Sequence, residues 1–323
     1  MREVEAAEWE ALGGDAYYRR AYVESACVLE PGRPRLLEHE GTVFAAIERG
    51  TVPQRGTVPK LNDVITPYGY GGPAGETRSD FWPAYDAWCR ENEVVTTFIR
   101  FHPVFQNQVG VPIHTEELAP TIGWRLDHDL LTEMHPKHRN VVRKGQSAGL
   151  EVKDGTGVGG FPVLYEETMR RAGAEAFYFF PAGYWTALDR LGAGLACFEA
   201  FRDDEVVASA LCLASPPWLH YHLGAASEAG RKLGATTFLL YEIARWAQER
   251  GYERFHLGGG VGGGRDSLHE FKRRFDPGGE CPMAIGKVVH DAEAYIRLGG
   301  DPADLSGFFP AYRSSVSAGA SAR

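Results

Sequence analysis

The sequence predicts a mixed α/β fold in which two units of similar design follow one another. In the second half, amphipathic helical patterns alternate with short apolar or β-branched runs, and the first half repeats this mixture. The chain has 323 residues, a length at which two domains are the prior expectation. We expect the two units to join near residues 120–135.

The elements of the first half are predicted from apolar periodicity and turn residues. Residues 79–93 are expected to form a helix, with Ser79 as its N-cap and its large aromatic residues along one face. Residues 94–101 are a β-branched run that is typical of a buried strand. A helical stretch, a hairpin and a strand that enters a glycine-rich turn are expected at residues 1–30, 35–48 and 63–75.

The clearest helix of the second half is predicted from Thr132 to Ala148. Pro136 lies near its first turn, and Gly149 follows its end. A short strand over residues 124–131 precedes this helix. The elements expected after it are strands at 150–153, 194–202, 205–215, 218–225 and 255–257, and helices at 161–173, 184–191 and 236–251.

Composition and charge narrow the class of protein. The chain is 44% hydrophobic and 24% charged, as in an ordinary soluble protein, and it contains no apolar run of about 18 residues that would cross a membrane. Its acidic N-terminus shows no signal peptide, and its five scattered cysteines are expected to be reduced, so we expect a cytoplasmic protein. The net charge of −9 argues against DNA or general nucleic-acid binding but leaves room for a local basic patch. We expect a monomer without a membrane partner.

The stretch from Tyr252 to Gly279 organises the second half. A short apolar run enters a loop with six glycines and leaves into a basic amphipathic segment. Glycines let the backbone approach a ligand closely. A strand that ends in such a turn is a common place to hold an anionic or acyl group.

Three stretches together resemble a known family. They are DVITPYGYGGP at 63–73, HPKHRNVVRKGQSAGLEV at 135–152, and the segment from Tyr221 to Phe275. In their order and spacing they resemble the GNAT acyl-CoA N-acyltransferase superfamily, and more narrowly the Fem-type aminoacyl transferases and their BioF2-like acetyltransferase relatives. The resemblance implies two tandem GNAT-like domains with mixed sheets flanked by helices. The first would span 1–130 and be completed by 290–313, the second would span 131–289, and residues 314–323 would be a disordered tail.

The resemblance also implies an amide-forming acyltransferase. Fem-type enzymes move an amino acid from aminoacyl-tRNA to an amine, often of a cell-wall precursor, while relatives in natural-product pathways use small-molecule amines and others use acyl-CoA. We favour aminoacyl-tRNA as the donor, a small amine as the acceptor, and no cofactor or metal. A CoA thioester donor and a non-catalytic GNAT-like binding module remain the alternatives. A hydrolase ranks last, because the sequence has no G-x-S-x-G elbow and no H-E-x-x-H helix.

Lys272 is the first candidate for the chemistry. In the resembling family, the lysine of the motif F-K-x-x-F lies at the reaction centre, where its ammonium would stabilise an oxyanion or meet a tRNA phosphate. The alternative is a solvated helix face anchored by Phe271 and Phe275. Candidates for accepting the amine's proton are Asp266 and His269, and also the strand histidines His220 and His222.

Two histidines alternate along one predicted strand. His220 and His222 are expected on the same face, with His256 on a neighbouring strand. A metal site is conceivable from these three, but we favour side chains that line a substrate cleft or lie half-buried in the sheet.

Basic residues are candidates for donor phosphates. Lys137, Arg139 and Arg143 lie on the predicted basic helix, and Arg139 and Arg143 share a face. Arg231 and Gly234 match part of the CoA-binding pattern R/Q-x-x-G-x-G/A, in which Thr236 replaces the last small residue. Arg273 and Arg274 follow the candidate lysine. The alternative in each case is an ordinary charged surface or turn.

Candidates for acceptor binding come from both halves. Asp63 and Tyr68 lie by the first glycine-rich turn, where an Asx-turn with a packing tyrosine is the alternative. By resemblance, an arginine equivalent to Arg171 or its neighbour Arg170 binds acceptor phosphates, beside the aromatic Tyr178; Phe271 completes the set. The family's early acceptor-binding lysine has no match, which argues against a nucleotide-linked peptidoglycan acceptor.

Overall fold

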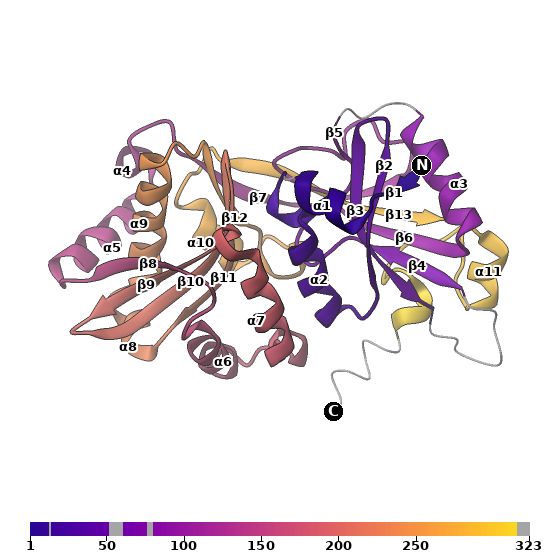
Figure 1. Ribbon diagram of the computed structural model, residues 1–323. Coiled ribbons are helices and arrows are strands. Elements are labelled where there is room, and N and C mark those ends of the chain that lie inside the picture. Colours follow the sequence, from indigo (N-terminus) through magenta and orange to yellow (C-terminus); the bar gives the residue numbers. More distant parts are fainter. Residues whose placement is uncertain (13, 52–60, 76–79, 315–323) are drawn as a thin grey trace. The chain divides into compact units, whose positions relative to one another are not determined.

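The computed structural model describes residues 1–12, 14–51, 61–75 and 80–314 (Figure 1). The chain forms two compact units. Unit 1 is Met1–Glu117 with the segment from Met283 onward, and unit 2 is Leu118–Pro282. The junction expected at residues 130–131 lies inside unit 2. The expected N-cap Ser79, and the expected tail from residue 315 onward, lie outside the described residues.

Unit 1 is built on a mixed sheet. Its strands run in the order β1-β2-β3-β4-β6-β13, with β5 paired to β3. The β4–β6 pair is parallel, and the other neighbours are antiparallel. The bounds are β1 Arg2–Glu3, β2 Arg33–His39, β3 Thr42–Gly50, β4 Asn62–Ile65, β5 Ala74–Gly75, β6 Val94–Arg100 and β13 Glu280–Val289.

Helices cover both faces of this sheet. Val94 of β6 belongs to the apolar cluster that contains helix α3, while the next residue, Val95, belongs to the cluster that contains α11. Because successive strand residues face opposite sides, α3 and α11 lie on opposite faces (Figure 1). The helices of unit 1 are α1 Ala6–Leu12, α2 Arg20–Leu29, α3 Phe81–Glu91 and α11 Ala292–Arg297, with short 3₁₀ turns at Ala16–Tyr18 and Ala311–Arg313.

The strands of unit 2 also run both parallel and antiparallel to one another. Its strand order is β7-β12-β11-β10-β9-β8, in which only the β11–β12 pair is parallel. The bounds are β7 His114–Arg125, β8 Glu151–Thr156, β9 Leu195–Arg202, β10 Glu205–Ser215, β11 Trp218–Ala226 and β12 Arg254–Gly258.

Helix α9 is the central helix of unit 2. It contributes Phe238, Leu239 and Ile243 to a core that also contains Phe198 of β9, and α5 packs along it. Helix α6 covers the opposite face of the sheet, against β10 and β11 (Figure 1). The helices are α4 Leu130–Glu133, α5 Pro136–Ser147, α6 Phe161–Ala172, α7 Ala182–Leu188, α8 Glu228–Leu233, α9 Ala235–Glu249 and α10 Ser267–Arg273, with 3₁₀ turns at Ala176–Tyr178, Asp189–Gly194 and Val261–Gly263.

The two units share one design. In each, three antiparallel strands (β2-β3-β4 or β9-β10-β11) lead through a helix (α3 or α9) to a parallel strand (β6 or β12), which an antiparallel strand (β13 or β7) flanks. The mixed α/β class with helices flanking the sheets is therefore confirmed. Among the described helices, none is long and apolar enough to cross a membrane.

Several elements differ from the sequence prediction. Where a strand was expected at 124–131, β7 begins at His114 and ends at Arg125, and β13 was not predicted. Neither segment has a clean alternation, and each pairs with a strand far away in sequence, which local patterns do not encode. The expected loop at 230–236 contains the end of helix α8, which Ser227 caps through its side chain.

Candidate functional site

Strands β11 and β12 are paired only at their beginning. Their parallel register ends where His220 lies opposite His256, although β11 continues to Ala226. A β-bulge follows directly in β11, with His222 as the extra residue against β10. Bulges re-aim side chains and often occur beside active sites. The point where the two strands part is therefore the candidate active site.

The glycine-rich loop after β12 is held by Asp266. Its carboxylate accepts hydrogen bonds from the backbone N–H of Val261, at 3.0 Å, and of His269, at 2.8 Å, and it caps helix α10. These backbone hydrogen bonds lower the pKa of Asp266. A Cβ at Gly260 would clash with the Asp266 carboxylate, so the tight loop requires glycine there. A carboxylate stabilised in this way is a weak base, so we assign Asp266 to the shape of the loop rather than to proton transfer.

Lys272 is buried where β11 and β12 part. Its Nζ donates a hydrogen bond of 2.7 Å to the carbonyl of Gly259, the residue after β12, and lies 5.8 Å from the ring centroid of Tyr221 in β11. Burial lowers the pKa of Lys272 to about 8, while the charge of Asp266 opposes this shift. The site thus holds a partly desolvated ammonium that remains mainly protonated at neutral pH. The solvated helix face considered for Lys272 does not occur, because the side chain is only 8% exposed.

Tyr221 is a residue of this site that sequence reasoning missed. A Cβ at Gly224 would clash with the Tyr221 hydroxyl, so this glycine leaves room for the ring along the strand. The only signal in the sequence is an aromatic residue between two histidines, followed by glycine.

His138 fixes the position of α10. From α5, its Nε2 donates to the carbonyl of Phe271 at 3.0 Å, and its ring contacts Phe271 and Phe275, with centroids 5.0 and 4.5 Å away. The two phenylalanines anchor one side of α10 and Lys272 lies between them in sequence. Phe271, predicted to bind substrate, therefore acts in the packing of α10.

We expect the free energy of unfolding to fall as the pH drops from about 6.5 to about 4. Burial lowers the pKa of His138 to about 4, so below its ordinary value of about 6.5 the unfolded chain takes up a proton that the folded chain does not. The loss is about 1.4 kcal/mol for each pH unit in this window. Urea unfolding between pH 7.5 and 4.5 measures it. His138→Gln keeps an N–H donor but cannot titrate, so an unchanged slope in that variant would contradict the assignment.

The candidate histidines His220, His222 and His256 lie at the point where β11 and β12 part, or close to it. His220 and His256 approach through their Nδ1 atoms at 3.3 Å, and His256 Nε2 contacts the Thr121 hydroxyl at 2.9 Å. His222 Nε2 lies 2.6 Å from the hydroxyl of Tyr184 in α7, and burial with the charge of His220 lowers the pKa of His222 to about 3. These imidazoles are buried or partly buried in the sheet, as the sequence favoured.

His269 keeps an unused ring nitrogen. The residue is 2% exposed, and its Nε2 has no hydrogen-bond partner in the part of the chain that the structure describes. It remains a candidate proton acceptor on the same helix as Lys272.

Arg171, one of the predicted acceptor-binding residues of unit 2, lies near the end of β11. Arg171 donates to the carbonyl of Ala226 and, at 3.3 Å, to the hydroxyl of Thr168. Tyr178 is partly buried in the short turn after α6. In unit 1, Tyr68 is partly buried and its carbonyl accepts from Tyr22.

The basic residues of α5 and α8 divide into exposed and engaged ones. Lys137, Arg143 and Arg231 are exposed, whereas Arg139 donates to the carbonyl of Thr132 at 3.0 Å. Helices α5 and α8 are in contact, and Lys144 of α5 donates to the carbonyl at the end of α8. Lys137, Arg143 and Arg231 are therefore the predicted phosphate ligands of these two helices whose charges face solvent.

Arg273 and Arg274 belong to α10 and its end. Both form ion pairs with Glu270, at 2.9 and 3.6 Å. A shared carboxylate partner already offsets part of their charge, so they are weaker phosphate ligands than the exposed residues of α5 and α8.

The start of α9 is crowded. Gly234 has the left-handed backbone conformation, with φ of 71°, and a Cβ there would clash with Val141 of α5. Ala235 is fully buried. The backbone amides that would cradle a CoA pyrophosphate at this helix start are thus partly covered by α5.

Asp63 does not bind an ammonium ion. It is fully buried. Its carboxylate accepts hydrogen bonds from Arg49 Nε at 2.7 Å, from Arg313 Nε at 2.6 Å and from the Tyr312 hydroxyl at 3.3 Å. Both oxygens are engaged by partners of unit 1. The predicted substrate role is corrected to a structural one, because the sequence cannot show which arginines fold onto this carboxylate.

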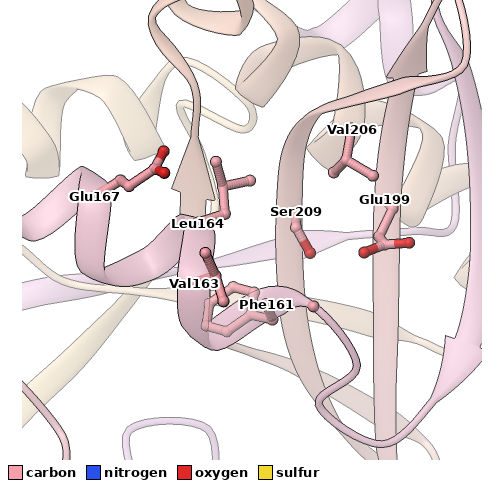
Figure 2. Close-up of a pocket in the computed structure, with 8 residues that line it drawn as sticks. Phe161, Val163, Leu164, Glu167, Glu199, Val206 and Ser209 are labelled. Carbon is pink, nitrogen blue, oxygen red and sulfur yellow. The ribbon is translucent and has the colours of Figure 1, made fainter.

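A shallow pocket lies elsewhere on unit 2. Figure 2 shows the side chains of α6 facing those of β9 and β10, with the Ser209 hydroxyl near the Glu199 carboxylate. It is lined by Gly160, Phe161, Val163, Leu164, Glu167, Glu199, Val206 and Ser209. None of the predicted site residues is among them.

The second half of the chain matches a known domain family. Residues 134–273 match the model of an acetyltransferase (GNAT) domain, and this match contains α5, the parted strands and Lys272. No curated protein sequence matches the chain significantly.

Similar solved structures extend over most of the chain. FemX is 14% identical with a TM-score of 0.63, over 92% of this chain and 99% of that one. L-PGS from Bacillus licheniformis is 15% identical with a TM-score of 0.58, over 90% of this chain and 93% of that one. The C-terminal domain of a protein assigned as a lysylphosphatidylglycerol synthetase, from Agrobacterium fabrum, is 13% identical with a TM-score of 0.54, over 84% and 88%. At these identities the similarity shows a shared fold.

Proposed function

We propose that this chain, whose residues 134–273 match an acetyltransferase (GNAT) domain, forms amide bonds with an aminoacyl group taken from aminoacyl-tRNA. The acceptor is the amine of a small molecule. The single observation that carries the proposal is the buried Lys272 ammonium at the point where β11 and β12 part.

The proposed reaction needs few protein groups. The acceptor nitrogen attacks the ester carbonyl, a C–N bond forms, the C–O bond to the terminal ribose breaks, and the amine's proton passes to the ribose oxygen. Positioning and charge stabilisation dominate such a transfer. The Lys272 ammonium faces the negative charge that develops on the carbonyl oxygen, and burial strengthens this interaction.

Two features favour tRNA over CoA as the donor. Helix α5 crowds the start of α9, where CoA pyrophosphate would be held. Lys137, Arg143 and Arg231 are exposed cations on an otherwise acidic chain, and such cations suit RNA phosphates.

A donor assay tests the proposal. We expect an amide product with a mixed pool of aminoacyl-tRNAs and a panel of small amines, none after RNase treatment, and none with acetyl-CoA in place of tRNA. The product is detected by mass spectrometry. The expected loss for Arg143→Gln is in KM for tRNA, with a shallower salt dependence. RNase-resistant product would overturn the tRNA assignment, and product with acetyl-CoA alone would establish the CoA alternative.

A further inference from the structure

Unit 1 contains a cluster of three arginines and two carboxylates. Arg49 pairs with Glu30 and with Asp63, and Arg313 pairs with Asp63. Arg100 interacts electrostatically with both Glu30 and Arg49. Four of the five charges thus compensate one another, and Arg100 leaves the cluster with one excess positive charge.

The Arg100 side chain has no carboxylate partner among the described residues. Its Nη1 donates only to the backbone carbonyl of Thr66, at 3.3 Å, and its guanidinium lies 5.0 Å from the ring centroid of Phe98. It is partly buried, and burial lowers its pKa. Buried cations are normally paired, since an unpaired one loses its hydration without replacement. The remaining N–H donors of Arg100 are those that a planar anion would engage.

Arg100 lies at the carboxyl end of a parallel pair of strands, where ligands of α/β folds commonly bind. It ends β6, which runs parallel to β4, and the loop after β4 crosses this end: Gly71 N–H donates to the Arg100 carbonyl at 2.8 Å. Ligands of open α/β sheets bind outside the carboxyl ends of parallel strands. In that loop Gly69 and Gly72 have positive φ values of 99° and 91°, which keeps side chains out of the turn.

We propose that Arg100 binds an anionic group, a carboxylate or a phosphate, of a small ligand at the carboxyl end of β4 and β6. Phe98 supports the plane of the guanidinium, and the neighbouring Arg49 and Arg313 are already paired with carboxylates, so Arg100 itself supplies the charge for the ligand.

Thermal unfolding of the intact protein tests the site without any transfer assay. The probes are inorganic phosphate and acetate, titrated at fixed ionic strength so that general screening is constant. We expect the Tm of the native protein to rise by a few degrees with at least one probe, and the stronger of the two identifies the chemistry. In Arg100→Met the apparent Kd for that probe weakens about tenfold or more.

The same variant separates a binding role from a structural one. Without anion, Arg100→Met is expected to be at least as stable as the native protein, because it removes an uncompensated cation. The matched control is Arg35→Met, which removes a buried arginine paired with Glu3 and Glu48. It is expected to lower the Tm and to keep the anion response. An Arg100→Met protein that loses as much stability as Arg35→Met, or that keeps the anion response, would overturn the site. Failure of the donor assay leaves this result unaffected.

Discussion

Replacing Lys272 with methionine is expected to lower kcat/KM for acyl transfer by about 10²–10³-fold, the usual effect of removing one donor from an oxyanion site. Methionine keeps an unbranched apolar side chain of similar length, so the niche against Tyr221 stays filled. The loss should appear in kcat, because the ammonium meets a charge that exists only in the transition state.

The pH profile distinguishes an ammonium from a neutral base. With a pKa of about 8, Lys272 is protonated below that pH. If it stabilises an oxyanion, the rate declines as the pH rises through about 8; if the neutral amine accepted the acceptor's proton, the rate would climb there instead. Steady-state kinetics from pH 6.5 to 9.5 give the answer. Lys153→Met, on exposed β8 of the same unit, is the matched control and should retain full activity.

Replacing Asp63 with alanine is expected to destabilise unit 1 by about 3–5 kcal/mol, the range for breaking a buried ion pair from one side. The variant leaves Arg49, which is 5% exposed, and Arg313 without their shared carboxylate. Arg313 belongs to the C-terminal segment, so the change also loosens that segment from β3 and β4.

Chemical denaturation of native and variant proteins measures this loss. The control is Glu293→Gln, which removes an exposed carboxylate from α11 of the same unit and should change the stability by less than about 0.5 kcal/mol. An Asp63→Ala protein of native stability with a raised KM for the acceptor would instead restore the substrate role that its sequence context suggested.

The sequence determined the local structure around the candidate site. The helix predicted at 132–148 is α5, which begins at Pro136 and ends two residues before Gly149, and the strands expected at 194–202 and 205–215 form the β9–β10 hairpin. The F-K-x-x-F spacing placed Lys272 between two core phenylalanines. These features depend on neighbours along the chain, so their physics is contained in short segments.

Tertiary structure decided which charged residues face partners inside the fold. Asp63 and Asp266 have the same side chain, both beside glycine-rich turns, and both were predicted to act on substrate. In the fold, the first is enclosed by Arg49 and Arg313, and the second accepts backbone N–H groups of its own loop. Arg100 differs from both aspartates, because its guanidinium has no carboxylate partner among the described residues. Only the folded cluster shows this.

The resemblance of the second half to a GNAT domain and the helix that carries Lys272 could thus be predicted from the sequence alone, whereas the burial of Lys272 could not. The sequence alone also could not predict which charges pair, that β13 flanks β6, or that β11 and β12 part. Each of these features joins segments that lie far apart in the chain. Pairing energies of this kind depend on distance and burial, and only the folded chain sets these two quantities.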